Sequence, residues 1–127
     1  MKSGLIVTAM SLVLATTAHA QQILSAGTIY GGPAQTRVVC YVYNSGASAV
    51  GLAGTRITDH LGNVQALVVN QCGANLPAGQ SCGIAAIAAG NTPYACRTVV
   101  SPNKTNTRGI LEVRNSSQVT LQNVELR

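Results

Sequence analysis

The chain has 127 residues, with eight Lys or Arg, three Asp or Glu and a formal net charge of +5. Charged residues make up 9% of it, against about a quarter in an average soluble domain. There is no Trp or Phe and only four Tyr, so the core must be built from Val, Ile, Leu and Ala. The basic residues are dispersed and do not alternate with aromatic ones, which argues against a nucleic-acid partner.

Residues 1–20 are predicted to be a signal peptide. A positive charge follows the first residue, residues 4–18 are mostly apolar, and Ala18-His19-Ala20 supplies the small residues of a cleavage site. A membrane anchor is the alternative, but an anchor needs about 20 consecutive apolar residues, and this run is shorter. Gln21 stands where a lipoprotein would have Cys. We therefore expect residues 21–127 to be one secreted or periplasmic domain without membrane insertion after cleavage.

The remainder of the chain has the pattern of an all-β protein. Short apolar runs with period two are separated by Gly, Asn, Pro and Ser clusters every 8–12 residues, the spacing typical of a sandwich or barrel. Residues 71–81 form the longest irregular connection. We expect strands at 22–30, 36–44, 48–59, 63–70, 82–89, 94–101, 107–114 and 118–126.

The last of these strands contains an irregularity. Val119 and Leu121 have one parity, whereas Val124 and Leu126 have the other. If both pairs face the same side, a β-bulge near residues 122–123 must reset the alternation.

Four cysteines in an exported domain imply two disulfides. Zinc is the alternative, but there is no CxxC pair, and His60 is the only histidine after residue 20. Three disulfide pairings are possible for Cys40, Cys72, Cys82 and Cys96.

Strand parity favours one pairing. Cys40 shares a face with Val38 and Val42, opposite Arg37, and Cys96 lies on the face opposite Arg97. Because burying an unpaired Arg is costly, both cysteines should point inward. We therefore predict that Cys40–Cys96 links two sheets and that Cys72–Cys82 closes its own loop.

Three stretches then resemble an immunoglobulin-like β-sandwich of the kind found in small secreted bacterial proteins. They are a strand followed by Asn-Ser-Gly at 41–46, a strand and turn at 57–63, and the Leu-Pro-Ala-Gly-Gln-Ser-Cys step at 76–82. Tyr94, two residues before Cys96, resembles the tyrosine corner of this fold, whose hydroxyl bonds to nearby backbone. The core Trp of antibody domains is absent. The resemblance implies an Ig-like sandwich of about 7–8 antiparallel strands, used in adhesion, assembly or binding.

The titratable groups do not predict an enzyme. Asp59 and His60 are adjacent, so on a strand they would point to opposite faces; Asp59 is expected to form an Asx-turn and His60 to be solvated. For Glu112, a cross-strand ion pair is the expected role. No nucleophile elbow, phosphate loop or metal-ligand cluster is present, so we expect no catalytic residues, cofactor or metal, and a small hydrolase is the least favoured function.

Arg37, Tyr41 and Tyr43 are the candidate binding patch. They share the outward face of one predicted strand, and Tyr is favoured at interfaces. The alternative is that Tyr is present because it has high strand propensity. Lys104 and Arg108 flank a hairpin tip and are a weaker binding signal.

The leading hypothesis is therefore an exported, non-catalytic module that acts by protein binding, adhesion or envelope assembly, with an unknown protein or glycan partner. Self-association through an edge strand at 22–30 or 119–126 is one way to assemble. The alternative is a secreted inhibitor or ligand-binding protein that uses the disulfide-closed 71–83 loop as a rigid finger.

Overall fold

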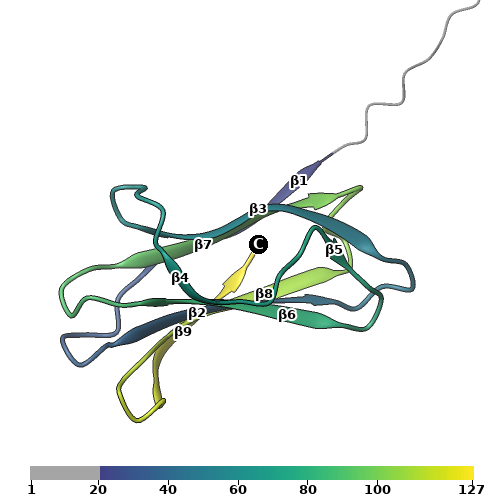
Figure 1. Ribbon diagram of the computed structural model, residues 1–127. Helices are drawn as coiled ribbons and strands as arrows, with labels where there is room; N and C mark the ends of the chain where they lie inside the picture. Colours follow the sequence, from purple (N-terminus) through teal and green to yellow (C-terminus); the bar gives the residue numbers. More distant parts are fainter. Residues whose placement is uncertain (1–20) are drawn as a thin grey trace, which may run out of the picture.

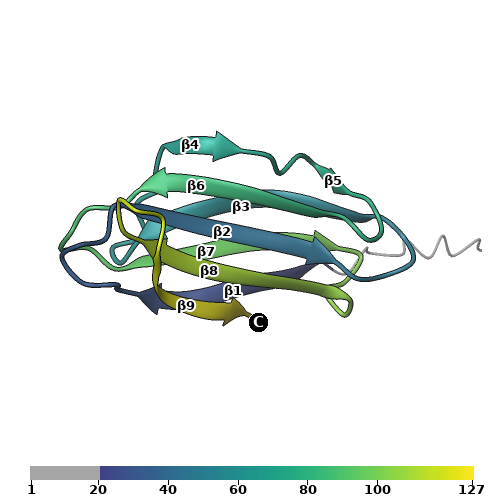
Figure 2. The same cartoon turned by 90° about the horizontal axis from the view of Figure 1, so that it is seen from below.

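The computed structural model describes residues 21–127, so the predicted signal peptide at 1–20 lies outside the described residues. These residues form two stacked β-sheets, seen edge-on in Figure 1 and from below in Figure 2. One sheet has the strand order β1-β7-β3-β5, and the other has the order β4-β6-β2-β8-β9. The described part of the chain contains no helix that is long and apolar enough to span a membrane. The nine strands are β1 (Gln22–Ile29), β2 (Arg37–Asn44), β3 (Val50–Asp59), β4 (Leu67–Asn70), β5 (Asn75–Leu76), β6 (Ser81–Ile87), β7 (Tyr94–Ser101), β8 (Thr107–Arg114) and β9 (Thr120–Leu126).

The alternating pattern of the sequence becomes the burial pattern of the strands. In β7, residues alternate strictly between buried and half-buried from Tyr94 to Ser101. The core between the sheets is built mainly from aliphatic side chains and Cys, as the composition requires. Its largest fully buried apolar side chains are Leu24, Val38, Val42, Ile57, Ile84, Val100, Leu111 and Val113.

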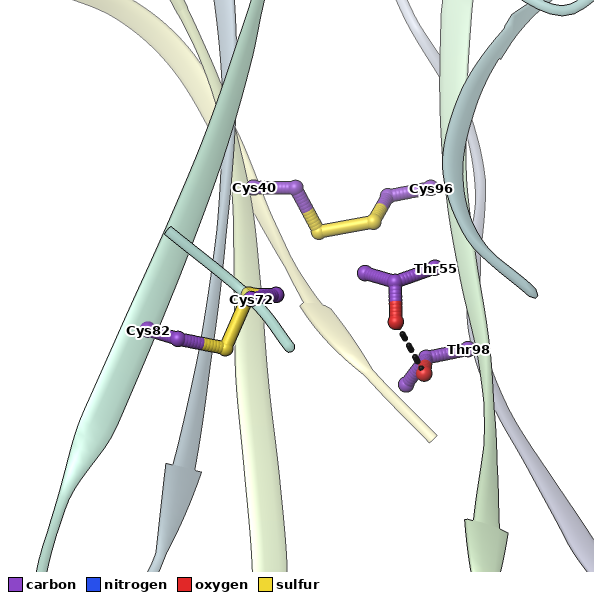
Figure 3. The surroundings of a disulfide bond; sticks show 6 residues. All are labelled: Cys40, Thr55, Cys72, Cys82, Cys96 and Thr98. Carbon is purple, nitrogen blue, oxygen red and sulfur yellow. Dashed lines mark hydrogen bonds between the residues drawn. A yellow bond between two sulfur atoms is a disulfide. The ribbon is translucent and has the colours of Figure 1, made fainter. Parts of the chain in front are cut away.

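Both disulfides have the pairing that strand parity predicted. Cys40 on β2 bonds Cys96 on β7 across the interior, with a Cα–Cα distance of 6.3 Å, as Figure 3 shows. Cys72 bonds Cys82 within the β4-β6 region, at a Cα–Cα distance of 5.0 Å. Because β2 and β7 are interior strands of their sheets, the first bond links the two layers near their centres.

Beside the inter-sheet disulfide lies a polar pair inside the core. Thr98 is fully buried, as its parity predicted, and its hydroxyl lies 2.7 Å from that of Thr55 (Figure 3). Thr55 reaches it because the β3–β7 register shifts between Ala53 and Arg56, where Gly54 has a φ of 60°. A glycine with positive φ is typical of one β-bulge type, and the sequence patterns did not indicate this bulge.

Tyr94 has the backbone hydrogen bond that the resemblance implied. The side chain is 2% exposed, and its hydroxyl oxygen accepts the N–H of Ala89 at 2.7 Å. A buried Tyr hydroxyl needs such a partner.

The region between β3 and β6 differs from the prediction. Residues 63–65 do not begin the next strand; they turn back onto β3, where Gln65 N–H donates to Ile57 O at 2.9 Å. The connection expected to be irregular contains β5, which pairs with the start of β3. A two-residue strand is too short to show an alternation in the sequence, and its partners Gly51 and Val50 lie 24 and 26 residues away in the chain.

The bulge in β9 exists, but it lies nearer the start of the strand than predicted. Val113 pairs with Gln122 and Arg114 pairs with Thr120, so Leu121 is the extra residue. Leu121, Val124 and Leu126 contribute to the core, whereas Val119 is exposed and precedes the strand. Because Val119 is not in the core, the bulge changes parity only between Leu121 and the pair Val124 and Leu126, and it therefore lies closer to the turn than predicted.

The first and last strands, β1 and β9, lie at sheet edges, as expected, but backbone hydrogen bonds connect β1 to Arg127, directly after β9. Ser25 of β1 and Arg127 exchange two backbone hydrogen bonds, at 3.0 and 2.8 Å. The Lys104 ammonium also donates to Ile23 O at 2.9 Å. These bonds occupy part of the β1 edge that another strand would need.

Candidate functional site

The outer face of the five-stranded sheet brings the predicted patch together with residues from β8. Arg37, Tyr41 and Tyr43 all lie on this face of β2, and Tyr41 and Tyr43 are 37% and 45% exposed. Their register partners on β8 are Arg114, Ile110 and Arg108, respectively. Val39 has the same parity as these residues but is buried. We call this surface the tyrosine face: Arg37, Tyr41, Tyr43, Arg108, Ile110, Glu112 and Arg114.

Tyr41 is held at the centre of the tyrosine face. A Cβ added to Gly83 on the neighbouring β6 would lie 3.1 Å from its ring, so the ring packs closely over this glycine and would have to shift for a larger residue. The Arg114 guanidinium carbon lies 5.9 Å from the ring centroid, which is cation–π distance. The ring is therefore fixed by contacts on both sides before any partner binds.

Glu112 makes an ion pair, but not across strands as predicted. Its Oε2 accepts from Arg114 on the same strand, with the shortest N–O distance at 2.7 Å. The cross-strand neighbours of Glu112 are Val39 and Asn123, and neither carries a positive charge. The hydrogen bond that Arg114 donates to Glu112, and then the one that it donates to the Tyr41 hydroxyl, raise the pKa of Arg114 above its ordinary value. Glu112 thus orients the guanidinium that contacts Tyr41.

Two hollows flank Tyr41. One, of about 270 Å³, lies toward β9, and Tyr43, Ile110, Arg108 and Glu125 are among the residues that line it. The other, of about 140 Å³, lies toward β4 and includes Val39, Val69 and Arg37. An aromatic ring beside hollows, the larger of which is lined by charges of both signs, forms the kind of surface on which protein side chains dock.

Sequence reasoning named Arg108 only as a weaker binding signal and did not join the residues of β8 and β9 to the two tyrosines. Arg108, Ile110, Glu112 and Arg114 share one parity along residues 107–114, which places them on one face. Glu125 lies between Val124 and Leu126, so its parity places it outward, but only the register shows that it lies beside Ile110.

Asp59 has the structural role expected of it. Its Oδ1 accepts the N–H groups of Leu61 and Asn63, both at 2.9 Å, and its Oδ2 accepts from the Asn63 side chain. These hydrogen bonds, the Asn63 amide first, lower the pKa of Asp59 below its ordinary value. His60 is exposed. In residues 21–127, no group of three or more His, Cys, Asp or Glu side chains could hold a metal ion.

The two cations of the hairpin tip line one hollow of about 370 Å³ but differ in their other contacts. Lys104 is bound to β1 through Ile23 O. Arg108 donates to the carbonyls of Thr105 and Thr107 and borders the larger hollow on the tyrosine face. Only Arg108 therefore contributes to the candidate site.

The loop closed by Cys72–Cys82 lies against the sandwich. Leu76 is buried, Leu52 N–H donates to Ala74 O at 3.0 Å, and Gly79 N–H donates to Asn44 O at 2.8 Å. Its exposed residues are 73–75 and the turn at 77–81, on either side of Leu76.

Comparison of the chain with protein-family models, with curated proteins and with solved structures found no match to any of them.

Proposed function

We propose that this protein is an exported, non-catalytic module of the Ig-like sandwich class that binds a partner through the tyrosine face. The observation that carries the proposal is Tyr41, which is partly exposed yet held between Gly83 and Arg114 and flanked by two hollows. A fixed aromatic ring loses little conformational entropy on binding, which is why Tyr is enriched among residues that dominate binding energy.

The charges of the tyrosine face fit a protein partner better than a partner that carries charge of one sign only. Arg37 and Arg108 carry positive charge, while Glu125 borders the larger hollow with negative charge. Protein surfaces present both signs, and complementary charges at the rim set orientation and association rate. Binding, adhesion and envelope assembly all use such a contact.

Several observations support export and a non-catalytic role. The N-terminal pattern is that of a signal peptide, and the two disulfides are typical of an oxidising compartment such as the periplasm or the medium. The carboxylates of Asp59 and Glu112 are already engaged, by a turn and by Arg114. Neither is paired with a nucleophile or a base, which general acid–base catalysis requires.

The test is capture of a partner by Tyr43→Ala and Tyr41→Ala variants. Oxidised protein is immobilised and exposed to periplasmic extract or culture medium, and captured proteins are identified by mass spectrometry. Tyr30→Ala is the matched control, because Tyr30 is 43% exposed and lies outside the tyrosine face. We expect a protein captured by the wild type and the control to be lost from both face variants, and its retention by them would refute the proposal. If a glycan array responds in the same residue-dependent way, the partner is a glycan instead.

The loop hypothesis needs a different variant from simple deletion. Removing residues 73–81 would also remove β5 and the buried Leu76, so loss of binding would reflect unfolding. Gln80→Ala and Ala78→Glu change only exposed positions of the turn. If these loop variants fail to capture the partner and the tyrosine variants still capture it, the protein is an inhibitor or ligand-binding protein that acts through the 71–83 loop, and our proposal is wrong.

A further inference from the structure

The outer face of the four-stranded sheet carries two arginines side by side. Arg56 on β3 and Arg97 on β7 are direct register partners, and Ser25 on β1 is the partner of Arg97 on its other side. Because Ile57 and Cys96 point inward, Arg56 and Arg97 share the outward face. We call this set the arginine row: Ser25, Arg97 and Arg56.

Both arginines of the row lack an acidic partner among residues 21–127. The one ion pair in that range joins Glu112 and Arg114 on the other sheet. The nearby acid on β3 is Asp59, whose carboxylate is occupied by its own turn. Like charges directly opposite each other destabilise a sheet. A counter-charge near Arg56 and Arg97 would therefore stabilise it.

The two arginines of the row are partly enclosed, and one of their buried donors has no partner in residues 21–127. Arg56 and Arg97 are half-buried, and the Arg56 Nε is buried without a hydrogen-bond partner in the described residues. On the same face, Ala95 and Val99 flank Arg97 along β7, and Thr58 follows Arg56 on β3. Glu125 and Arg127 line a hollow with Ser25 at the β1 end of the row, but no carboxylate forms an ion pair with Arg56 or Arg97 in the described residues. A row of donors from two guanidiniums and one hydroxyl favours an anion.

We propose that the arginine row binds a phosphate or sulfate group. Two adjacent guanidiniums match the double charge and several oxygens of such a group, which Arg binds through paired N–H donors. A carboxylate carries one charge and would balance only one of the two arginines. The site is separate from the tyrosine face, because it lies on the opposite outer surface of the sandwich.

The sheet that carries the tyrosine face provides an internal control. Arg37 and Arg114 are also direct register partners there, but Glu112 bonds Arg114. The two pairs therefore have the same residue types and are both direct register partners, and they differ in the presence of a protein carboxylate.

The experiment follows the Arg Nε–H resonances by NMR while inorganic phosphate is added at constant ionic strength. Sulfate, acetate and chloride are added in parallel titrations. We expect saturable shifts at Arg56 and Arg97 with phosphate and sulfate, and much smaller ones at Arg37 and Arg114. Arg97→Gln should weaken phosphate binding about tenfold or more, since a charge-assisted pair of hydrogen bonds is lost, whereas Arg37→Gln should leave it unchanged. Equal shifts at all four arginines, or equal effects of acetate and chloride, would mean general charge screening and would overturn the proposal.

Thermal unfolding separates binding from a structural role of Arg97. Without phosphate, Arg97→Gln should unfold at the same temperature as the wild type or higher, because it removes a like-charge contact. Added phosphate should raise the unfolding temperature of the wild type but not of the variant. A lower unfolding temperature for the variant, with no phosphate effect on either protein, would assign Arg97 a structural role only.

A vesicle experiment identifies the source of the phosphate group. Phosphatidylcholine vesicles with and without phosphatidic acid, whose phosphomonoester can carry two charges, are sedimented with the protein. Co-sedimentation that needs phosphatidic acid and is lost in Arg97→Gln assigns the site to a lipid headgroup. Phosphate binding without co-sedimentation assigns it to a soluble phosphorylated or sulfated ligand, and absence of both refutes the site.

Discussion

Each outer face of the sandwich carries a pair of arginines opposite each other on neighbouring strands, but the two pairs have different surroundings. On the tyrosine face, Arg114 is opposite Arg37, bonds Glu112 and lies beside the Tyr41 ring. On the other sheet, Arg56 is opposite Arg97, and Asp59, three residues along β3, serves its turn. We propose that the first pair belongs to a face that docks a protein and that the second pair has its charge balanced by a bound anion. The comparison teaches that the position of three acids, more than that of seven arginines and lysines, decides which cations are available after residue 20.

The largest effect is expected from removing the Cys40–Cys96 disulfide, which links the two sheets. The Cys40→Ala/Cys96→Ala variant should lose about 4 kcal/mol of unfolding free energy, because the bond closes a long loop in the unfolded chain. Guanidinium unfolding without reductant measures it.

The matched comparison for this variant is Cys72→Ala/Cys82→Ala. Its loop is shorter, so the loss should be about 3 kcal/mol. If the second variant is the less stable of the two, the inter-sheet bond is not the main stabilising link.

The next largest effect concerns the bulge that precedes Arg56. Gly54 has a φ of 60°, and a Cβ added there would meet no atom within 4 Å, so the effect of Gly54→Ala is backbone strain alone. We expect a loss of about 1–2 kcal/mol in urea unfolding. Gly54→Asn, which tolerates this conformation better, should lose less. Equal stability of all three proteins would contradict the bulge as the element that sets the register of Arg56 against Arg97.

Glu112→Gln should make the tyrosine face resemble the arginine row. The ion pair is partly buried, with Glu112 16% and Arg114 23% exposed, so its loss should reduce stability by about 1 kcal/mol. Arg37 and Arg114 should then show the phosphate-dependent NMR shifts expected of Arg56 and Arg97. Glu125→Gln is the control, since the exposed Glu125 makes no ion pair in residues 21–127. Unchanged behaviour of Arg37 and Arg114 would show that the carboxylate does not distinguish the two faces.

The smallest effect concerns Asp59, the acid that does not reach the arginine row. Its pKa in the fold is below the ordinary 3.8, so the turn stabilises the fold above that pH, and the contribution is lost as pH falls through the lowered value. Asp59→Asn should flatten this acid-dependent part of the unfolding midpoint measured from neutral pH down to about pH 2. An unchanged acid dependence would show that the turn carboxylate does not contribute.

The fold was predictable wherever one strand carried a clear alternation. The pattern around Cys40 and Cys96 was sufficient to orient both side chains inward and to pair the cysteines. The candidate patch was predictable only in part, because the tyrosines lie on one strand while the hollows beside them need β6, β8 and β9. The short β5 and the bulge at Gly54 were missed because neither produces a run long enough to have a period.

By itself, the sequence determined the strand class, the inward and outward faces of the regular strands, the disulfide pairing and the Asx-turn at Asp59. Each of these depends on residues close together along the chain, or on one parity rule that applies to every strand. Only the tertiary structure decided that Arg56 faces Arg97, that Glu112 bonds along its own strand and that Arg127 joins β1. The physical reason is that strand register and sheet order are set by turns, bulges and packing over the whole domain, and a shift of one residue changes every cross-strand partner.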